Sequence, residues 1–137
     1  MNYLLDTNIV SESLRPAPDR EALRWLRFTP SSRLHISVLT IGELTRGIEL
    51  LQRRDPAQAA GPHRWADEVV AMFDRRILPV TAETAAAWGR LDARYQLPTI
   101  DGLIAATALI HHLTVVTHNV KDFERAGVPV LNPFTPG

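Results

Sequence analysis

Short apolar runs alternate along the chain with longer segments in which apolar residues recur every three or four positions. The runs are Tyr3–Leu5, Leu34–Val38, Ile77–Val80, Thr114–Thr117 and Gly127–Leu131. Runs of this length, apolar or rich in β-branched residues, are typical of buried strands. Because helix-like segments separate them, the pattern predicts an α/β protein whose parallel sheet carries helices on both faces. Pro79 places the third run at an edge or a strand end.

The intervening segments predict helices with one apolar face each. We expect these helices at about residues 9–14, 20–28, 39–51, 63–75, 81–95 and 101–110. Asp19 and Thr81 are the expected N-caps of the second and fifth helices. The last helix is apolar almost all round, which predicts that it is buried. The segment Arg53–Pro62 interrupts the periodicity and is expected to be a flexible loop.

Length and charge exclude several classes of protein. A chain of 137 residues, 45% hydrophobic and 22% charged, suits one globular domain that spans residues 1–137. Fifteen basic residues balance fifteen acidic ones, which argues against a nucleic-acid binder held by bulk positive charge but allows a local basic rim. The absence of cysteine excludes disulfides and thiolate metal sites. No leader segment or membrane-length apolar run is found, so we expect a cytoplasmic protein.

Four acidic residues occupy equivalent places relative to the predicted strands. Asp6 follows the first strand, Glu43 lies in the expected first turn of the helix after the second, Asp101 opens the buried helix, and Asp122 lies in the expected loop after the fourth strand. In a right-handed α/β sheet, the strand carboxyl ends and the following helix starts lie at one edge. The four carboxylates are therefore expected to share one crevice.

Each acid also has a structural interpretation. Glu43 stands three residues after Thr40, the spacing of a capping box. Asp101 could cap its helix and Asp122 could hold a turn, so the shared edge is what favours a site. Two carboxylates about 4 Å apart repel by roughly 4 kcal/mol at an effective dielectric near 20. Such a cluster raises pKa values or collects a cation, and oxygen ligands alone favour Mg²⁺ or Mn²⁺.

Motifs around these acids resemble the PIN-domain family, in particular the VapC- and FitB-like ribonuclease toxins of type II toxin–antitoxin pairs. They are Leu4–Asn8, Ile36–Ile48, Ile100–Thr107, Val116–Phe123 and the closing Val128–Pro133. Each motif is weak alone, but together they span nearly the whole chain in the family's order. The resemblance implies a three-layer α/β/α fold with a central parallel sheet of about four to five strands.

The resemblance also implies the roles of individual residues. The family's metal-binding acids map onto Asp6, Glu43 and Asp101. Many members carry Asp where this chain has Asn119, so either Asp122 substitutes as fourth ligand or Asn119 bonds to a ligand or water. Thr7 and Thr117 are candidates to orient the carboxylates through their hydroxyls.

Two basic side chains are candidates for RNA contact. His118 stands where similar sequences often have Arg, and Arg46 lies one turn after Glu43. Both could hold phosphate at the rim of the crevice. The ordinary interpretations are an exposed loop histidine and a solvated or ion-paired helix arginine.

The resemblance implies a Mg²⁺-dependent endoribonuclease that acts as a toxin, with the ion activating water for attack on RNA phosphate. It further implies a homodimer and a small antitoxin that lays a basic side chain among the acids. Two alternatives stay open. One is a PIN-like module that binds RNA or protein without cutting, and the other is phosphatase or DNA-nuclease chemistry on the same carboxylates.

Overall fold

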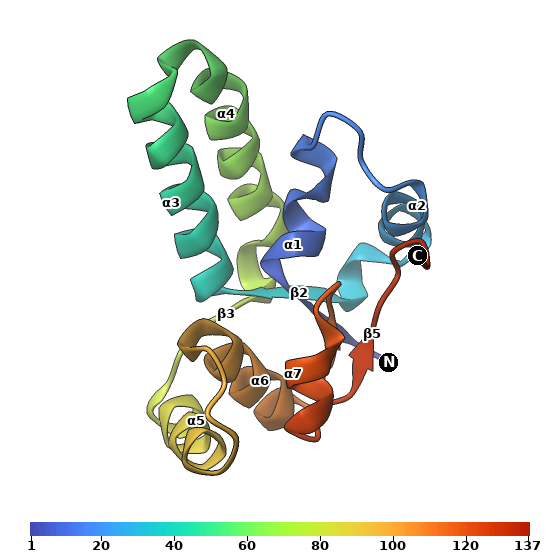
Figure 1. The fold of residues 1–137 in the computed structure, drawn as a ribbon, viewed down its shortest axis with the longest axis vertical. Helices are drawn as coiled ribbons and strands as arrows, with labels where there is room; N and C mark the ends of the chain where they lie inside the picture. The colour runs from blue at the N-terminus through green and yellow to red at the C-terminus, as the bar shows by residue number, and fades with distance from the viewer.

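Five short parallel strands form the centre of the molecule, described here by a computed structural model of residues 1–137 (Figure 1). The strands are β1 (Tyr3–Leu5), β2 (Leu34–Ser37), β3 (Ile77–Leu78), β4 (Thr114–Val116) and β5 (Val130–Leu131). Their order is β3-β2-β1-β4-β5, and every pairing is parallel. The predicted parallel sheet is confirmed, and β3 is an edge strand as Pro79 indicated. β1 is central, so the residue that follows it lies mid-sheet.

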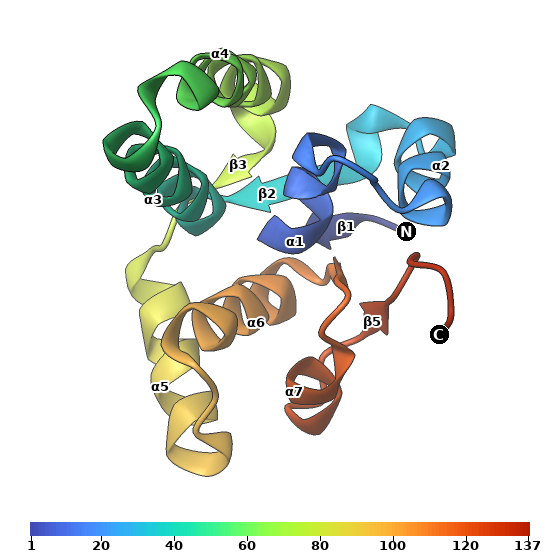
Figure 2. The ribbon, with the colours of Figure 1, turned by 45° about the horizontal axis from the view of Figure 1, so that its top comes forward.

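Helices cover both faces of this sheet, which confirms the three-layer α/β/α fold (Figure 2). The helices are α1 (Thr7–Val10, continued by a 3₁₀ turn at Ser11–Leu14), α2 (Arg20–Phe28), α3 (Val38–Arg54), α4 (Pro56–Phe73), α5 (Ala82–Tyr95), α6 (Thr99–His111) and α7 (Val120–Arg125). Asp19 caps α2 by accepting from the Ala22 N–H, and Thr81 caps α5 by accepting from the Thr84 N–H, both as predicted.

Alternate residues of the central strands separate two apolar cores. Leu4 and Val115 pack with α6 and α7, while Leu5 and Val116 pack with α1 to α4. Successive side chains of a strand point to opposite faces, so two adjacent leucines serve two cores. On α6, six residues are buried, among them Ile104, and the prediction of a buried helix is confirmed. None of the helices is both long and apolar enough to cross a membrane.

The predicted loop Arg53–Pro62 is wrong. α3 continues to Arg54, and α4 begins at Pro56 and runs through Pro62, so that the two helices form a hairpin broken at Asp55 alone (Figure 1). Pro56 stands at the start of α4, where a missing N–H costs no hydrogen bond. Packing between α3 and α4, with Ala59 fully buried, favours the helix across Gly61 and Pro62 despite their poor propensity.

Candidate active site

Asp6 lies directly beyond the carboxyl end of β1, where its own N–H donates to the Val116 carbonyl of β4 at 2.9 Å. The residue is only 6% exposed. It caps α1 by accepting from the Thr7 N–H at 2.8 Å through Oδ1. The strand and the helix that follows thus hold this carboxylate in a single orientation.

Thr117 and Asn8 hold the second oxygen of the same carboxylate. The buried Thr117 hydroxyl donates to Asp6 Oδ2 at 2.9 Å, and the Asn8 amide donates to the same oxygen at 3.3 Å. Asn8 Nδ2 also donates to Thr117 Oγ1 at 3.1 Å, and Asn8 Oδ1 accepts from the His118 N–H at 3.2 Å. This network ties the ends of β1 and β4 together around the carboxylate.

Glu43 joins the site through Thr7. The Thr7 hydroxyl donates to Glu43 Oε1 at 2.5 Å. Glu43 lies in the second turn of α3, because that helix begins at Val38 with Ser37 as its N-cap. The prediction that Glu43 lies in the first turn of its helix was therefore wrong. The alternative interpretation, in which Thr40 and Glu43 form a capping box, was wrong as well. Glu43 does not cap α3, and its carboxylate accepts a hydrogen bond from Thr7, the residue that follows Asp6.

Asp101 is a half-buried residue in the first turn of α6, where the N-cap is Pro98. Capping is therefore not its role. The pKa of Asp101 is raised to about 6, chiefly by burial and then by the negative charges of Asp6, Asp122 and Glu43, in that order of importance. The charges of the three other acids all act on Asp101, so each of them lies near its carboxylate.

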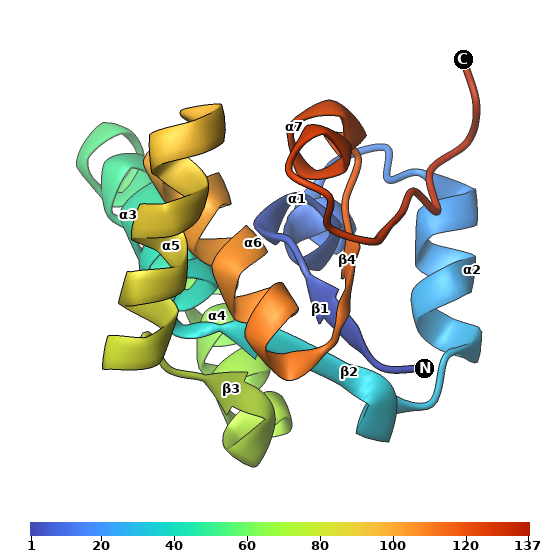
Figure 3. The same cartoon turned by 90° about the horizontal axis from the view of Figure 1, so that it is seen from below.

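Asp122 belongs to the first turn of α7 and does not lie in a loop, as had been predicted. Its carboxylate lies 3.5 Å from Arg125 Nη2. Figure 3 shows that α1, α6 and α7 lie around β1 and β4. Tertiary packing thus brings together residues that are more than 110 positions apart.

Burial and repulsion between carboxylates act together on Asp6 and on Asp101. Burial raises the pKa of Asp6, hydrogen bonds from Thr117 and Thr7 oppose this, and the Glu43 charge adds to the rise. Of the molecule's three salt bridges, only that of Asp122 involves one of these acids. No three acidic or histidine side chains converge closely enough to enclose a metal ion in this arrangement. The site is a region of concentrated negative charge and not a closed cage.

The remaining candidates are Asn119, His118 and Arg46. Asn119 is the N-cap residue of α7, where its side chain makes no capping bond and its N–H donates to Thr117 Oγ1 at 3.0 Å. His118 is exposed, and its ring stacks on Phe134 with centroids 4.6 Å apart. Arg46 is exposed on α3 and takes part in no salt bridge, so the ion-pair interpretation of this arginine is wrong.

Sequence reasoning missed the role of Asn8. It lies two residues after Asp6 and connects Asp6, Thr117 and His118. The signal available was a polar side chain at the start of a helix, directly after a strand that ends in a carboxylate. That signal does not reveal partners more than 100 residues away, which only the β1–β4 pairing provides.

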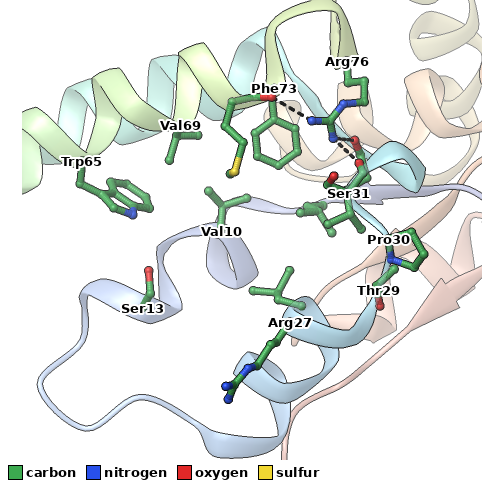
Figure 4. Close-up of a pocket in the computed structure, with 14 residues that line it drawn as sticks. Val10, Ser13, Arg27, Thr29, Pro30, Ser31, Trp65, Val69, Phe73 and Arg76 are labelled. Atoms are coloured by element: carbon green, nitrogen blue, oxygen red, sulfur yellow. Dashed lines mark hydrogen bonds between the residues drawn. The ribbon is translucent and has the colours of Figure 1, made fainter.

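An apolar pocket of about 470 Å³ is lined by residues of α1, α2 and α4 and contains none of these acids. Figure 4 shows Val10 of α1 facing Trp65, Val69 and Phe73 of α4. Arg76 closes one end by donating to the Leu34 carbonyl at 2.7 Å and the Met72 carbonyl at 2.8 Å. Trp65 packs against the core of α1 to α4 and also lines this open pocket.

Fold and site together define a class, the α/β proteins that gather carboxylates at the carboxyl edge of a parallel sheet. A family model described as PIN domain matches residues 3–129. The chain therefore belongs to the PIN-domain family, as the motifs indicated.

Curated relatives and solved structures agree with this assignment. The toxin FitB of Neisseria gonorrhoeae is 34% identical over 96% of this chain and 97% of its own length. The VapC ribonuclease Y4jK of Sinorhizobium fredii is 32% identical over 97% of this chain and 98% of its own length. The crystal structure of FitAcB from N. gonorrhoeae superimposes with a TM-score of 0.89 at 34% identity, covering 96% of this chain and 97% of the other. A toxin–antitoxin complex from Klebsiella pneumoniae superimposes with a TM-score of 0.74 at 27% identity, covering 98% and 100%.

Proposed function

We propose that this protein is an endoribonuclease, that it acts as the toxin of a toxin–antitoxin pair in the cytoplasm, and that residues 1–137 form one PIN domain. The observation that carries the proposal is the gathering of Asp6, Glu43, Asp101 and Asp122 at one edge of the sheet, with the pKa of Asp101 raised to about 6. Perturbed carboxylates in such a place are typical of functional sites. Relatives named as a toxin and as a ribonuclease specify the class.

The donor set fits a hard divalent cation. The side chains are carboxylates with neighbouring hydroxyls, and such oxygen ligands suit Mg²⁺ and also Mn²⁺. A cation would offset the repulsion that raises the pKa values of Asp6 and Asp101. Asp6 and Asp101 would be the principal ligands, and Glu43 and Asp122 would complete the set directly or through water. Such an ion, when bound, activates water and stabilises charge on the phosphate.

The chain's own residues orient this chemistry. Thr117, Asn8 and the Thr7 N–H hold both oxygens of Asp6, and the Thr7 hydroxyl holds Glu43. Partners of this kind fix ligating carboxylates and tune their affinity. Asn119, three residues before Asp122 in the chain, would bond to water or ligand at the position where relatives often have Asp. Arg46 would offer positive charge to RNA phosphate from the rim.

The test is cleavage of a mixed pool of RNAs by the purified protein freed of any bound partner. We expect cutting with Mg²⁺ or Mn²⁺, none with chelator, and a loss of about 10³-fold or more in both Asp6→Asn and Asp101→Asn. Asp67→Asn is the matched control, because that carboxylate is 79% exposed on α4. DNA and a phosphomonoester serve as comparison substrates.

The outcomes separate the alternatives. Cutting of DNA or release of phosphate in preference to RNA cleavage would replace the proposal with one of those activities. Folded wild-type protein that binds RNA but cuts none of several RNA classes would instead be a binding module. Equal cleavage by wild type and both carboxylate variants would remove the site assignment while leaving a nuclease.

The toxin proposal requires an antitoxin partner, and the apolar pocket offers a surface for it. Exposed apolar area of this kind marks protein-binding sites in soluble proteins. Met72 lines this pocket and is 58% exposed, so Met72→Lys should weaken capture of the co-expressed antitoxin by about tenfold or more without changing RNA cleavage. Leu50→Lys on α3, 48% exposed and outside the lining of this pocket, is the control. Unchanged capture would exclude this pocket as the docking surface. The homodimer implied by the family resemblance stays a prediction for sedimentation analysis.

A further inference from the structure

A polar pocket of about 540 Å³ borders the acidic site between the α1 segment and the C-terminal tail. Its lining includes Asn8, Ser11, Glu12, Arg15, Asp19, His118, Phe134 and Thr135. The volume lies within the range of about 300–1,000 Å³ usual for small-ligand sites. Asn8 belongs to the pocket and also donates to Asp6, so a group bound here lies next to the carboxylates.

Two stacked aromatic rings form one wall. The rings of His118 and Phe134 are inclined by 29° with centroids 4.6 Å apart. His118 is exposed and Phe134 half-buried, so His118 is the ring on which a further planar group can stack. The backbone N–H of His118 donates to Asn8, which fixes the position of the stack relative to the carboxylates. Stacked aromatic side chains of this kind hold unpaired bases.

The two acids in the pocket are already occupied by protein donors. Glu12, 3% exposed, accepts from the Asp19 N–H at 2.7 Å. Asp19 accepts from the Ala22 N–H at 2.9 Å and from both the N–H and the hydroxyl of Thr135 at 3.2 Å. These bonds lower the pKa of Asp19, led by the bond from Ala22. Each acid therefore serves to shape the wall and to hold the tail in place.

Arg15 remains as the exposed cation of the pocket. Its side chain is 69% exposed and approaches Glu12 at 3.6 Å through a single nitrogen. A guanidinium has five N–H donors, so most of them are free to bind a phosphate or a base edge. The pocket thus combines a stacking ring, a cation and polar groups, which together suit a nucleotide.

We propose that this pocket is a subsite for one unpaired nucleotide of the RNA, with its base stacked on His118 and its phosphate or base edge bound by Arg15. The inference depends on the proposed ribonuclease function and deepens it. A subsite of this kind makes the enzyme selective for single-stranded RNA, because bases within an A-form helix are not free to stack on a side chain. Phe134 and Thr135 give the C-terminal tail a positioning role, since they support the ring and the wall.

The test measures binding of fluorescent single-stranded RNA oligonucleotides in the Asp101→Asn background, alongside wild-type cleavage kinetics. His118→Ala should weaken binding and raise KM by roughly tenfold while kcat changes little. His118→Tyr, which keeps a stacking ring, should retain most of the affinity. Arg15→Gln should weaken binding several-fold and lower the slope of log K against log salt by about 0.7, the value for one phosphate contact on a single strand.

Matched control variants carry the same His→Ala and Arg→Gln substitutions at positions outside the pocket. His111→Ala at the far end of α6 and Arg54→Gln at the end of α3 should leave affinity unchanged. Equal affinity of His118→Ala, Arg15→Gln and these controls, with wild-type cleavage intact, would overturn the subsite while leaving the nuclease in place. Loss of affinity in His118→Tyr as large as in His118→Ala would overturn the stacking role. Absence of RNA binding and of wild-type cleavage would overturn the proposed function and this inference with it.

Discussion

The acidic site has two halves, Asp6 beside β1 and Asp101 on α6, and the protein surrounds their carboxylates differently. On the β1 side, Asp6 is 6% exposed and accepts hydrogen bonds from Thr7, Asn8 and Thr117. On the α6 side, Asp101 is half-buried, and the causes of its shifted pKa are burial and neighbouring negative charge without any compensating hydrogen bond. One carboxylate is held by the protein, while the other is repelled by its surroundings.

Because of this contrast, we expect Asp6 and Asp101 to contribute differently to the stability of the folded protein. Donors that surround Asp6 offset part of its burial cost, so that this half contributes to the folded structure as well as to the site. Asp101 is repelled by the neighbouring carboxylates and receives no compensating hydrogen bond from the protein. Its charge therefore lowers the free energy of unfolding until a cation is bound. Strain of this kind is typical of functional sites, where stability is exchanged for activity. The predictions below follow from this difference.

The largest effect is expected from removing the central donor of the β1 half. Thr117→Val deletes the bond to Asp6 Oδ2, removes one of the two acceptors of the Asn8 amide and leaves the Asn119 N–H without its acceptor. We expect a loss of about 1–3 kcal/mol in the free energy of unfolding and a roughly 10- to 100-fold drop in RNA cleavage. Denaturant titration and cleavage assays measure the two.

The control is Thr107→Val, also fully buried, whose hydroxyl donates to the Leu103 carbonyl within α6 at 2.8 Å. It should leave cleavage unchanged. Equal activity losses in the two variants would mean that Thr117 acts only through general stability, and would remove the distinction between the halves.

A smaller effect is expected from adding the metal ion. At a Mg²⁺ concentration about tenfold above its Kd, binding should stabilise the wild type by about 1.4 kcal/mol, a Tm rise of roughly 3–6 °C. Asp101→Asn should lose most of this rise, while Asp67→Asn keeps it. Differential scanning calorimetry with and without Mg²⁺ provides the comparison. An equal rise in all three proteins would place the bound ion away from the α6 half.

The smallest effect concerns pH in the absence of metal. The pKa of Asp101 rises from 3.8 to about 6 on folding, so the folded state binds more protons in that interval and wild-type stability falls as pH rises through it. Asn does not titrate, so Asp101→Asn should match the wild type near pH 4 and exceed it above pH 6.5. After allowing for solvent screening, we expect a gain of about 1 kcal/mol.

Thermal melts in chelator from pH 4 to pH 7.5 measure this difference. A stability gain that is independent of pH would show that the carboxylate charge is not its cause. A loss at pH 7.5 would contradict the view that the α6 half is repelled by its neighbours.

The alternation of apolar runs and amphipathic segments was enough to predict the parallel sheet and most of its helices, because burial of one face is a local requirement. The placement of the four acids at one edge followed from the handedness of α/β connections. Local pattern failed at residues 53–62, where Gly61 and the prolines indicate a loop but contacts between α3 and α4 favour a helix. It also placed Glu43 in the first turn of its helix and Asp122 in a loop, whereas Glu43 lies in the second turn of α3 and Asp122 in the first turn of α7.

By itself, the sequence determined the strand and helix order, the two-sided burial of residues such as Leu4 and Leu5, and the family. Only the tertiary structure decided which donors each carboxylate receives. The bonds of Asp6 to Thr117 span 111 positions, and those of Asp19 to Thr135 span 116. Hydrogen bonds need donor and acceptor within about 3 Å, and no periodicity along the chain encodes such a distance. The different character of the two halves of the site is therefore a property of packing.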